Sequence, residues 1–401
     1  MPTTDGRLRI VVGGYLGLAP AGGLAWDYLH YPLGFAALGH DVFYVEDTRL
    51  WPVYQAGGDG ADCAAGVAFL AAAMEGVGLG GRWAYRDEVS GRCFGMTEAA
   101  TREVCRTADV LVNLSCASVP RDEHASIPVR ILLDTDPMFT QIQLAEAGEG
   151  FTPGGSGIRS LVEAHTHHFT FGESVGREWC RIPACGVEWK PTRQPIFLPE
   201  WPAAELPAEA DAAFTTLMNW TAGRPLRHAG ETWGQKDVEF LRLADLPRRV
   251  PGLPLAVAVG QTGGAGEPFP REMVEASGWR VLDPDVCAPD PGSYRSFIQA
   301  SRGELSVAKE TYVKAGTGWF SGRSASYLAS GRPVVTQDTG WSRHLPSGEG
   351  LFAFRTVDEA AAALESIAAD PARHARVARR IAEEHFDSAV VLRRLLADAG
   401  V

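Results

Sequence analysis

The residues best placed to do chemistry lie in one glycine- and serine-rich stretch, residues 316–340. Its sequence, GTGWFSGRSASYLASGRPVVTQDTG, predicts a loop that leads into a helix and then into a buried strand. The start of such a helix offers free backbone N–H groups and a positive dipole end. Together with the hydroxyls of Ser321 and Ser324, the backbone of Gly322 and the guanidinium of Arg323, these groups suit a diphosphate. The alternative is a strand–loop–helix connection with a serine N-cap and no ligand.

A second group of candidates follows from the rarity of lysine, because 4 of the 37 basic residues are lysines and the rest are arginines. Lys236 stands at the start of a predicted helix, where its charge opposes the helix dipole and so favours a nearby anion. Lys309 follows a predicted strand and should face the space at the carboxyl end of the sheet. A solvated position in the first helical turn is the alternative for Lys236.

Two acidic segments of the N-terminal half can serve acid–base chemistry. Asp136, in the Asp-Thr-Asp-Pro sequence at 134–137, ends a predicted buried strand and can orient or deprotonate an acceptor hydroxyl at the edge of a cleft. A plain turn ending in Asp-Pro is the alternative. Asp27 and His30 lie at the start of the first predicted helix. An acidic residue that only pairs with the helix dipole is the alternative for Asp27.

Two further patterns are weaker. Gly13, Gly14 and Gly17 follow the first predicted strand and bring the backbone close to a ligand or to a neighbouring strand, but the dinucleotide fingerprint lacks its third glycine. The histidines of segment 165–168 would point to opposite faces of one strand and could not easily converge on an ion. We therefore predict no metal site.

The elements that must position these residues alternate between strands and helices. Strands are predicted at residues 8–14, 41–45, 110–114, 129–133, 167–171, 214–218, 255–259, 279–282, 304–308 and 333–336. Helices are predicted at 26–38, 61–74, 97–107, 235–243, 324–329, 357–369 and, as the last helices, 372–396. Such alternation is typical of doubly wound parallel sheets. We predict an α/β fold of two tandem Rossmann-like domains whose parallel sheets face a cleft.

A run of prolines around residues 195–213 interrupts the alternation, since proline continues neither a helix nor a central strand. We therefore predict an N-terminal domain at 1–195, a linker at 196–212 and a C-terminal domain at 213–375. A C-terminal helix at 376–401 is expected to pack back on the N-terminal domain.

Composition excludes several classes of protein. The chain has 401 residues, of which 45% are hydrophobic and 21% charged, so disorder, collagen and a small disulfide scaffold are excluded. The formal charge of −12 would repel a phosphate backbone, and we expect no nucleic-acid partner. Seven cysteines at irregular spacings indicate reduced thiols. No leader or membrane-spanning segment is predicted, so we expect a cytoplasmic protein; its oligomeric state is not readable from the sequence.

The 316–340 stretch resembles the donor half of GT-B glycosyltransferases, in which E-G-F-G-x-P-x-x-E-A-x-A-x-G-x-P-V-V is common. Residues that match this motif are Phe320, Ala329, Gly331, Pro333, Val334 and Val335. Gly318 and Ser326 stand where the family commonly has two glutamates, which contact the donor sugar and the nucleotide ribose. The variant sequence around Tyr327 is more similar to the spore-maturation-type branch of these enzymes.

The resemblance implies roles for the candidate residues. Donor contacts would come from the C-terminal domain, through Lys236, Lys309, the loop and helix start at 321–324, and Asn219 near the end of the strand that opens this domain. The acceptor would lie against the N-terminal domain. An inverting enzyme would need a base just after the first strand, which implies Asp27 first and His30 second.

The function that these residues imply is metal-independent transfer of a sugar from a nucleotide diphosphate sugar to a small-molecule or glycan acceptor, with no further cofactor. A nucleotide-sugar epimerase shares this architecture and is one alternative. A nicotinamide oxidoreductase that uses the glycine loop, and a non-catalytic nucleotide- or carbohydrate-binding protein, are the others. The sequence leaves open the donor base, the sugar, the acceptor and the stereochemistry.

Overall fold

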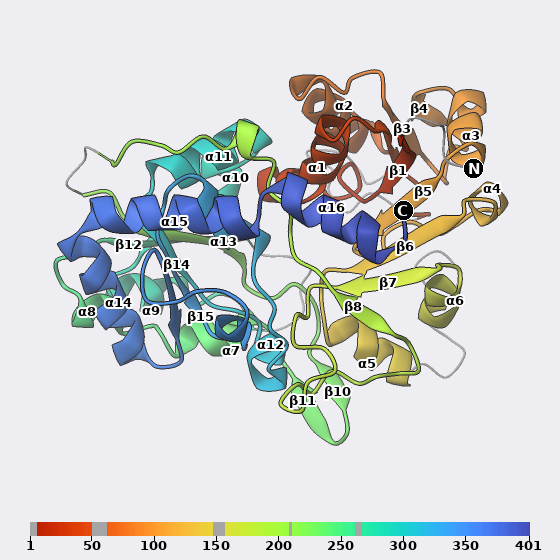
Figure 1. Ribbon diagram of the computed structural model, residues 1–401. Coiled ribbons are helices and arrows are strands. Elements are labelled where there is room, and N and C mark those ends of the chain that lie inside the picture. Colours follow the sequence, from red (N-terminus) through yellow and green to blue (C-terminus); the bar gives the residue numbers. More distant parts are fainter. Residues whose placement is uncertain (1–5, 50–61, 147–156, 208–210, 261–266) are drawn as a thin grey trace.

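A computed structural model describes residues 6–49, 62–146, 157–207, 211–260 and 267–401. The chain forms two α/β halves, each built on a largely parallel sheet (Figure 1). This is the predicted fold class, and most of the predicted strands agree with the observed ones within one or two residues.

The N-terminal half contains an eight-stranded sheet in the order β4-β3-β2-β1-β5-β6-β7-β8, in which only β4 runs antiparallel to its neighbour. Its strands are β1 (Arg9–Gly13), β2 (Asp41–Glu46), β3 (Trp83–Arg86), β4 (Cys93–Gly95), β5 (Val110–Leu114), β6 (Val129–Asp134), β7 (His167–Thr170) and β8 (Trp189–Pro191). Its helices are α1 (Gly22–Ala37), α2 (Ala64–Gly76), α3 (Glu98–Arg106), α4 (Asp122–Ala125), α5 (Phe139–Glu146) and α6 (Ile158–Glu163).

The C-terminal half contains a six-stranded sheet in the order β13-β12-β9-β14-β15-β16 and a two-stranded hairpin, β10-β11. The strands are β9 (Phe214–Asn219), β10 (Leu226–His228), β11 (Glu231–Trp233), β12 (Leu255–Gly260), β13 (Arg280–Leu282), β14 (Gly303–Ser306), β15 (Val334–Gln337) and β16 (Leu351–Phe354). The helices are α7 (Lys236–Leu241), α8 (Leu246–Arg249), α9 (Arg271–Ala276), α10 (Pro284–Cys287), α11 (Pro291–Ala300), α12 (Glu310–Ala315), α13 (Gly322–Ala329), α14 (Val357–Ala369), α15 (Pro371–His385) and α16 (Ser388–Asp398).

Both parallel sheets have a topological switch point, and this fixes where a ligand can bind. In the N-terminal half β1 pairs with both β2 and β5, and in the C-terminal half β9 pairs with both β12 and β14. Connections leave the sheet in opposite directions on the two sides of such a strand, which opens a crevice at its carboxyl end. The carboxyl ends of β5, β6, β9 and β12 all contribute to a single cleft between the halves.

Residues 196–207, the first part of the segment that joins the halves, pack against both of them. They include a short 3-10 helix, Leu198–Glu200, and Trp201 is fully buried. The Trp201 ring lies edge-on against Trp26 of α1 at 5.2 Å and against Tyr294 of α11 at 6.3 Å. Because Trp26 also donates a hydrogen bond to the Pro291 carbonyl at 2.8 Å, α1 and α11 are held together beside the cleft.

The end of the chain returns to the N-terminal half, although in two helices with different partners (Figure 1). α15 packs on α13 of the C-terminal half, and α16 packs on α1 of the N-terminal half. Gly34 of α1 permits this approach, since a Cβ there would lie 2.5 Å from a methyl group of Leu392. The crossing therefore belongs to α16 alone.

Candidate functional site

The interdomain cleft has a volume of about 1050 Å³ and is lined by both halves. It brings together most of the residues singled out from the sequence: Asp27, Asp136, Asn219, Lys236, Lys309, Ser321, Gly322 and Arg323. These residues come from segments almost 300 positions apart, so the fold gathers them at the switch points of the two sheets.

The start of α13 faces this cleft. Ser321 occupies the N-cap with an extended backbone, and its side chain caps no N–H group, so the first N–H groups of the helix stay available. Gly322 matters for the fit across the cleft, because a Cβ on it would lie 2.6 Å from Oδ1 of Asp27. Ser324 is different: it is fully buried, its Oγ has no hydrogen-bond partner among the described residues, and it does not line the cleft. Ser324 is therefore not a direct ligand contact.

Arg323 points into the protein as much as into the cleft. Its Nε donates to Glu304 at 2.6 Å, Nη1 donates to the Leu217 carbonyl at 2.6 Å, and Nη2 donates to the Ser306 hydroxyl. Glu304 is fully buried, so the guanidinium charge is largely balanced before any ligand arrives. Arg323 joins α13 to the ends of β9 and β14, which makes it first a structural residue.

Lys236 carries the unbalanced positive charge of this wall. It begins α7, lines the cleft and makes no hydrogen bond or ion pair within the described part of the chain. Burial holds the pKa of Lys236 well below its usual value, and the nearby charges of Arg323 and Lys309 act in the same direction. An anion placed beside Lys236 would relieve both effects.

Lys309 instead reaches across the cleft to the N-terminal half. Its ammonium binds the carboxylate of Asp136 and lies 4.6 Å from the centre of the Phe139 ring. The Tyr312 hydroxyl donates to the same carboxylate. Burial alone would raise the pKa of Asp136, but the charge of Lys309 and the two hydrogen bonds outweigh it and hold that pKa below its ordinary value.

The turn that carries Asp136 is held in place by the buried carboxylate of Asp134. Asp134 accepts hydrogen bonds from Thr140 at 2.7 Å, Gln141 at 2.9 Å and Thr170 at 2.8 Å. This network holds the end of β6 against β7 and the start of α5. It therefore fixes where Asp136 meets the cleft.

Asp27 is the other candidate acid of the N-terminal wall. Its backbone carbonyl accepts a hydrogen bond from Gln194, but its carboxylate has no partner among the described residues. Asp27 is exposed within the open cleft, but the atoms of the surrounding walls displace much of the water around it and raise its pKa to about 7; Arg323 partly offsets this shift and Asp136 adds to it. A carboxylate with a pKa near neutrality can accept a proton and release it again under physiological conditions.

The structure does not bring His30 to the cleft, which contradicts its prediction as an alternative base. Its Nδ1 accepts the N–H of Phe197 at 3.0 Å, and its ring packs beside Trp26 at 5.3 Å and Trp201 at 6.2 Å. Burial lowers the pKa of His30 to about 3, so the ring stays neutral. His30 anchors the linker to α1.

The glycine loop packs closely against neighbouring residues of the N-terminal half. A Cβ on Gly13 would lie 2.5 Å from the Ser118 hydroxyl, and one on Gly14 would lie 2.6 Å from the Tyr28 ring. Gly17 donates its N–H at 2.8 Å to Glu46, the acid at the end of β2 that a dinucleotide site would use for the ribose. These three glycines do not line the cleft, so the structure favours the alternative in which the loop approaches neighbouring residues, and the acid that a nicotinamide enzyme would use is already bonded to the loop backbone.

The missing motif glutamates have a structural explanation at Gly318. Its φ of +75° is a left-handed conformation that side chains other than glycine rarely adopt. A Cβ there would also lie 2.7 Å from the hydroxyl of Ser174 in the N-terminal half. Ser326, at the second position, is buried and donates back to the Gly322 carbonyl at 3.2 Å. Neither position can present an acid to the cleft in this packing.

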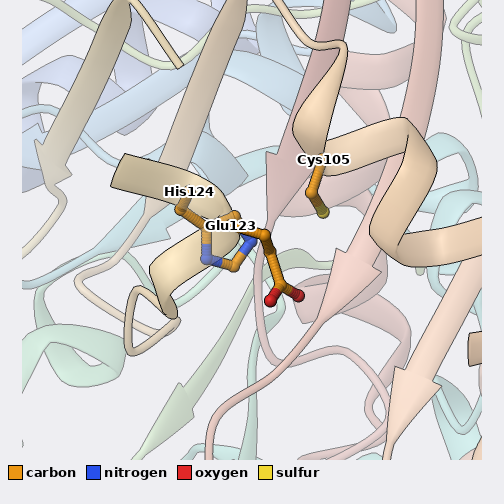
Figure 2. Close-up of side chains that lie close together, drawn as sticks. All are labelled: Cys105, Glu123 and His124. Carbon is orange, nitrogen blue, oxygen red and sulfur yellow. The ribbon is translucent and has the colours of Figure 1, made fainter. Parts of the chain in front are cut away.

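One group of potential metal ligands occurs among the described residues, and it lies away from the cleft. Cys105, Glu123 and His124 place ligand atoms within 4.8 Å of one another (Figure 2). However, Arg86 binds Glu123 at 2.7 Å, and burial raises the pKa of the Cys105 thiol to about 12. A guanidinium already occupies the place of a cation there. The histidines of segment 165–168 bond to separate partners, including the carbonyls of Leu161 and Val162.

Sequence reasoning missed most of the aromatic lining of the cleft. Tyr15, Tyr31, Phe69 and Phe171 line it from the N-terminal half, and Trp319 from the other. Aromatic residues at helical or strand spacing are usual in any core, so nothing in the sequence distinguishes those that face a cavity. Ser115, at the end of β5, was also missed; its φ of +56° indicates backbone strain at the cleft edge.

Comparison with known proteins supports the interpretation of the C-terminal half. Residues 287–397 match a family model described as glycosyl transferase-like. This match contains α13 and β14 to β16, but it covers less than half of the chain. Among curated proteins none matches.

Solved structures match almost the whole chain. The chain aligns over 98% of its length with 100% of Anabaena HepE in complex with UDP and glucose, at 11% identity and a TM-score of 0.55. It aligns equally fully with an alpha-glucosyltransferase in complex with UDP and a DNA 13-mer, at 12% identity and a TM-score of 0.60. The chain has the GT-B fold. AviGT4, a glycosyltransferase involved in avilamycin A biosynthesis, shares this GT-B architecture over 98% of the present chain and 97% of its own, at 15% identity and a TM-score of 0.51.

The GT-B assignment fits the charge distribution of the cleft, because its C-terminal wall carries the unpaired lysine and the free helix N-terminus. None of the helices in the described residues has the length and apolar character needed to span a bilayer.

Proposed function

We propose that this chain is a glycosyltransferase that moves a sugar from a nucleotide diphosphate sugar to an acceptor hydroxyl. The observation that carries the proposal is that two charges without a partner in the described part of the chain line one cleft, Lys236 on the C-terminal wall and Asp27 on the N-terminal wall. The first suits a leaving diphosphate, and the second suits a base for the attacking hydroxyl.

The proposed reaction is a single displacement. Asp27 takes the proton of the acceptor hydroxyl while the hydroxyl oxygen bonds to the anomeric carbon. The bond between this carbon and the diphosphate oxygen breaks, and the diphosphate leaves with the bonding electrons. Lys236 and the N–H groups at the start of α13 stabilise the charge that develops on it, which needs no metal ion or further cofactor. The configuration at the anomeric carbon inverts.

In this proposal the two domains bind different substrates. Residues 213–375 hold the donor, residues 1–195 hold a small-molecule or glycan acceptor, and residues 196–212 link the two. Uridine diphosphate is the first nucleotide to consider, because HepE and the alpha-glucosyltransferase are each described in complex with UDP. The alpha-glucosyltransferase is also described with DNA, but a formal charge of −12 argues against a nucleic-acid acceptor here. We place the reaction in the cytoplasm.

Calorimetric titration of UDP, GDP, ADP, CDP and dTDP into the protein tests the donor half. One diphosphate should bind, and Lys236→Met should weaken its binding about tenfold to a hundredfold, as expected for a lost charged hydrogen bond. Lys190→Met is the matched control, because Lys190 bonds the Asp398 carbonyl away from the cleft. Equal affinities of the two variants would show that Lys236 does not contact the diphosphate. Binding of none of the five diphosphates would refute the donor assignment.

A further inference from the structure

The two walls of the cleft carry opposite charges. Described residues that line it from the N-terminal half include two carboxylates, Asp27 and Asp136, and no lysine, arginine or histidine. Those that line it from the C-terminal half include Lys236, Lys309 and Arg323 against a single carboxylate, Asp285. Because Lys309 already pairs with Asp136, the charges that remain for a substrate spanning the cleft include the carboxylate of Asp27 on the N-terminal side and the ammonium of Lys236 on the C-terminal side, neither of which has a partner among the described residues.

We infer that the acceptor is a hydroxyl compound that carries no phosphate or carboxylate group, and that a protonated amine on it is favoured. The inference rests on the proposed function and specifies its acceptor. An anionic acceptor would bring a like charge next to Asp27, whose carboxylate has no partner among the described residues, whereas Lys309 already offsets the charge of Asp136. Phosphorylated sugars, uronic acids and lipid phosphates are therefore excluded as acceptors.

The acidic wall already holds an ammonium group in this structure, that of Lys309. The ammonium binds the Asp136 carboxylate beside the Phe139 ring, with the ring centre at 4.6 Å. A carboxylate next to an aromatic face is a recurrent arrangement for cation recognition. Asp27, on the same wall, has no such partner among the described residues. An amine on the acceptor would supply the missing positive charge on this side.

The rest of the wall suits a carbohydrate-like ring. Tyr15 and Phe69 provide apolar surface on which the C–H face of a sugar can pack. Tyr31 lines the cleft, and its buried hydroxyl has no hydrogen-bond partner among the described residues. A bound hydroxyl group would satisfy it. These contacts do not depend on the charge of the acceptor, so a neutral polyhydroxyl acceptor can also bind. Discrimination against anionic acceptors therefore comes from the carboxylates.

Saturation-transfer NMR on the UDP-bound protein tests this with a matched series: glucosamine, glucose, glucose 6-phosphate and glucuronate. We expect glucosamine to bind at least as well as glucose, and both at least tenfold more tightly than either anion. Anions that bind as tightly as glucose, or a series in which no member binds, would overturn the inference. Neither result depends on the donor assignment, because failure of that assignment shows earlier, as absence of UDP binding.

Two variants decide whether the carboxylates cause the selectivity. Asp27→Asn should reduce the preference for glucosamine over glucose 6-phosphate at least severalfold, since it removes the unpaired negative charge. Asp285→Asn is the matched control on the opposite wall and should leave the preference unchanged. An equal effect of the two substitutions would mean that the overall charge of the cleft, and not the N-terminal wall, selects the acceptor.

Discussion

Each wall of the cleft holds a balanced charge and a charge without a partner among the described residues. On the C-terminal wall Arg323 is balanced by Glu304, while Lys236 has no partner among the described residues. On the N-terminal wall Asp136 is balanced by Lys309, while Asp27 has none. The balanced groups join elements of the fold to one another, and the unbalanced groups face the space where substrates would bind.

Whether a charged residue has a partner therefore distinguishes structural residues from candidate functional residues more clearly than its residue type does. In a buried pair, the attraction between the partners offsets part of the desolvation cost of both charges, so neither charge needs a ligand to balance it. A confined charge without a partner costs free energy in the empty protein, and a ligand or a proton can relieve that cost. Substitutions of the balanced groups should therefore affect stability first, and substitutions of the unbalanced groups should affect turnover or binding first.

The largest effect is expected at Asp27. Asp27→Asn should lower kcat by about a hundredfold to ten-thousandfold, the usual contribution of a general base, while UDP affinity stays within a factor of about two. The wild-type rate should rise with pH through about 7, because Asp27 must be ionised to accept a proton. Steady-state rates from pH 5 to 9 check both points.

Two results for Asp27 would contradict the role that we assign to charges without a partner. A variant with unchanged kcat would show that the unpaired carboxylate is not the base. A rate that falls as pH rises through 7 would show that the protonated form is the active one.

The next largest effect is expected at Arg323, on stability. Arg323→Ala leaves Glu304 buried and unpaired and should cost about 3–5 kcal/mol of unfolding free energy. The double variant Arg323→Met with Glu304→Gln removes both charges and should recover most of this loss. Urea denaturation followed by circular dichroism measures it. A stable Arg323→Ala protein with strongly weakened UDP binding would instead make Arg323 a ligand contact, as the sequence alone suggested.

The alternation of strands and helices could be predicted because it depends on local patterns. Helix 357–369 was predicted with its observed bounds, and there the Thr356 side chain and Glu359 form a capping box that marks the start. Strands β3, β4 and β8 were missed because three or four residues carry too little periodicity. The hairpin β10–β11 was missed for the same reason.

The site was predictable only as far as residue type carries information. The rarity of lysine drew attention to Lys236, and the loop composition drew attention to Arg323. The partner of Arg323 is Glu304, which lies on another element, and the packing of His30 depends on Trp201 in the linker. Such contacts arise between segments far apart in sequence, so a single sequence contains no signal that would distinguish a balanced charge from a free one.

The smallest effect, and the sharpest comparison, concerns the two carboxylates of the N-terminal wall. The pKa of Asp27 is raised to about 7, so its ionised form destabilises the fold as pH rises. The pKa of Asp136 is lowered, so its ionised form stabilises the fold above the ordinary carboxylate range, and this is lost on acidification. Between pH 5 and 8, Asp27→Asn should therefore gain Tm relative to the wild type, increasingly with pH, while Asp136→Asn should lose Tm across the same range. Differential scanning calorimetry at pH 5, 6.5 and 8 distinguishes the two signs, and a shift of the same sign in both variants would mean that the walls do not divide their charges as described.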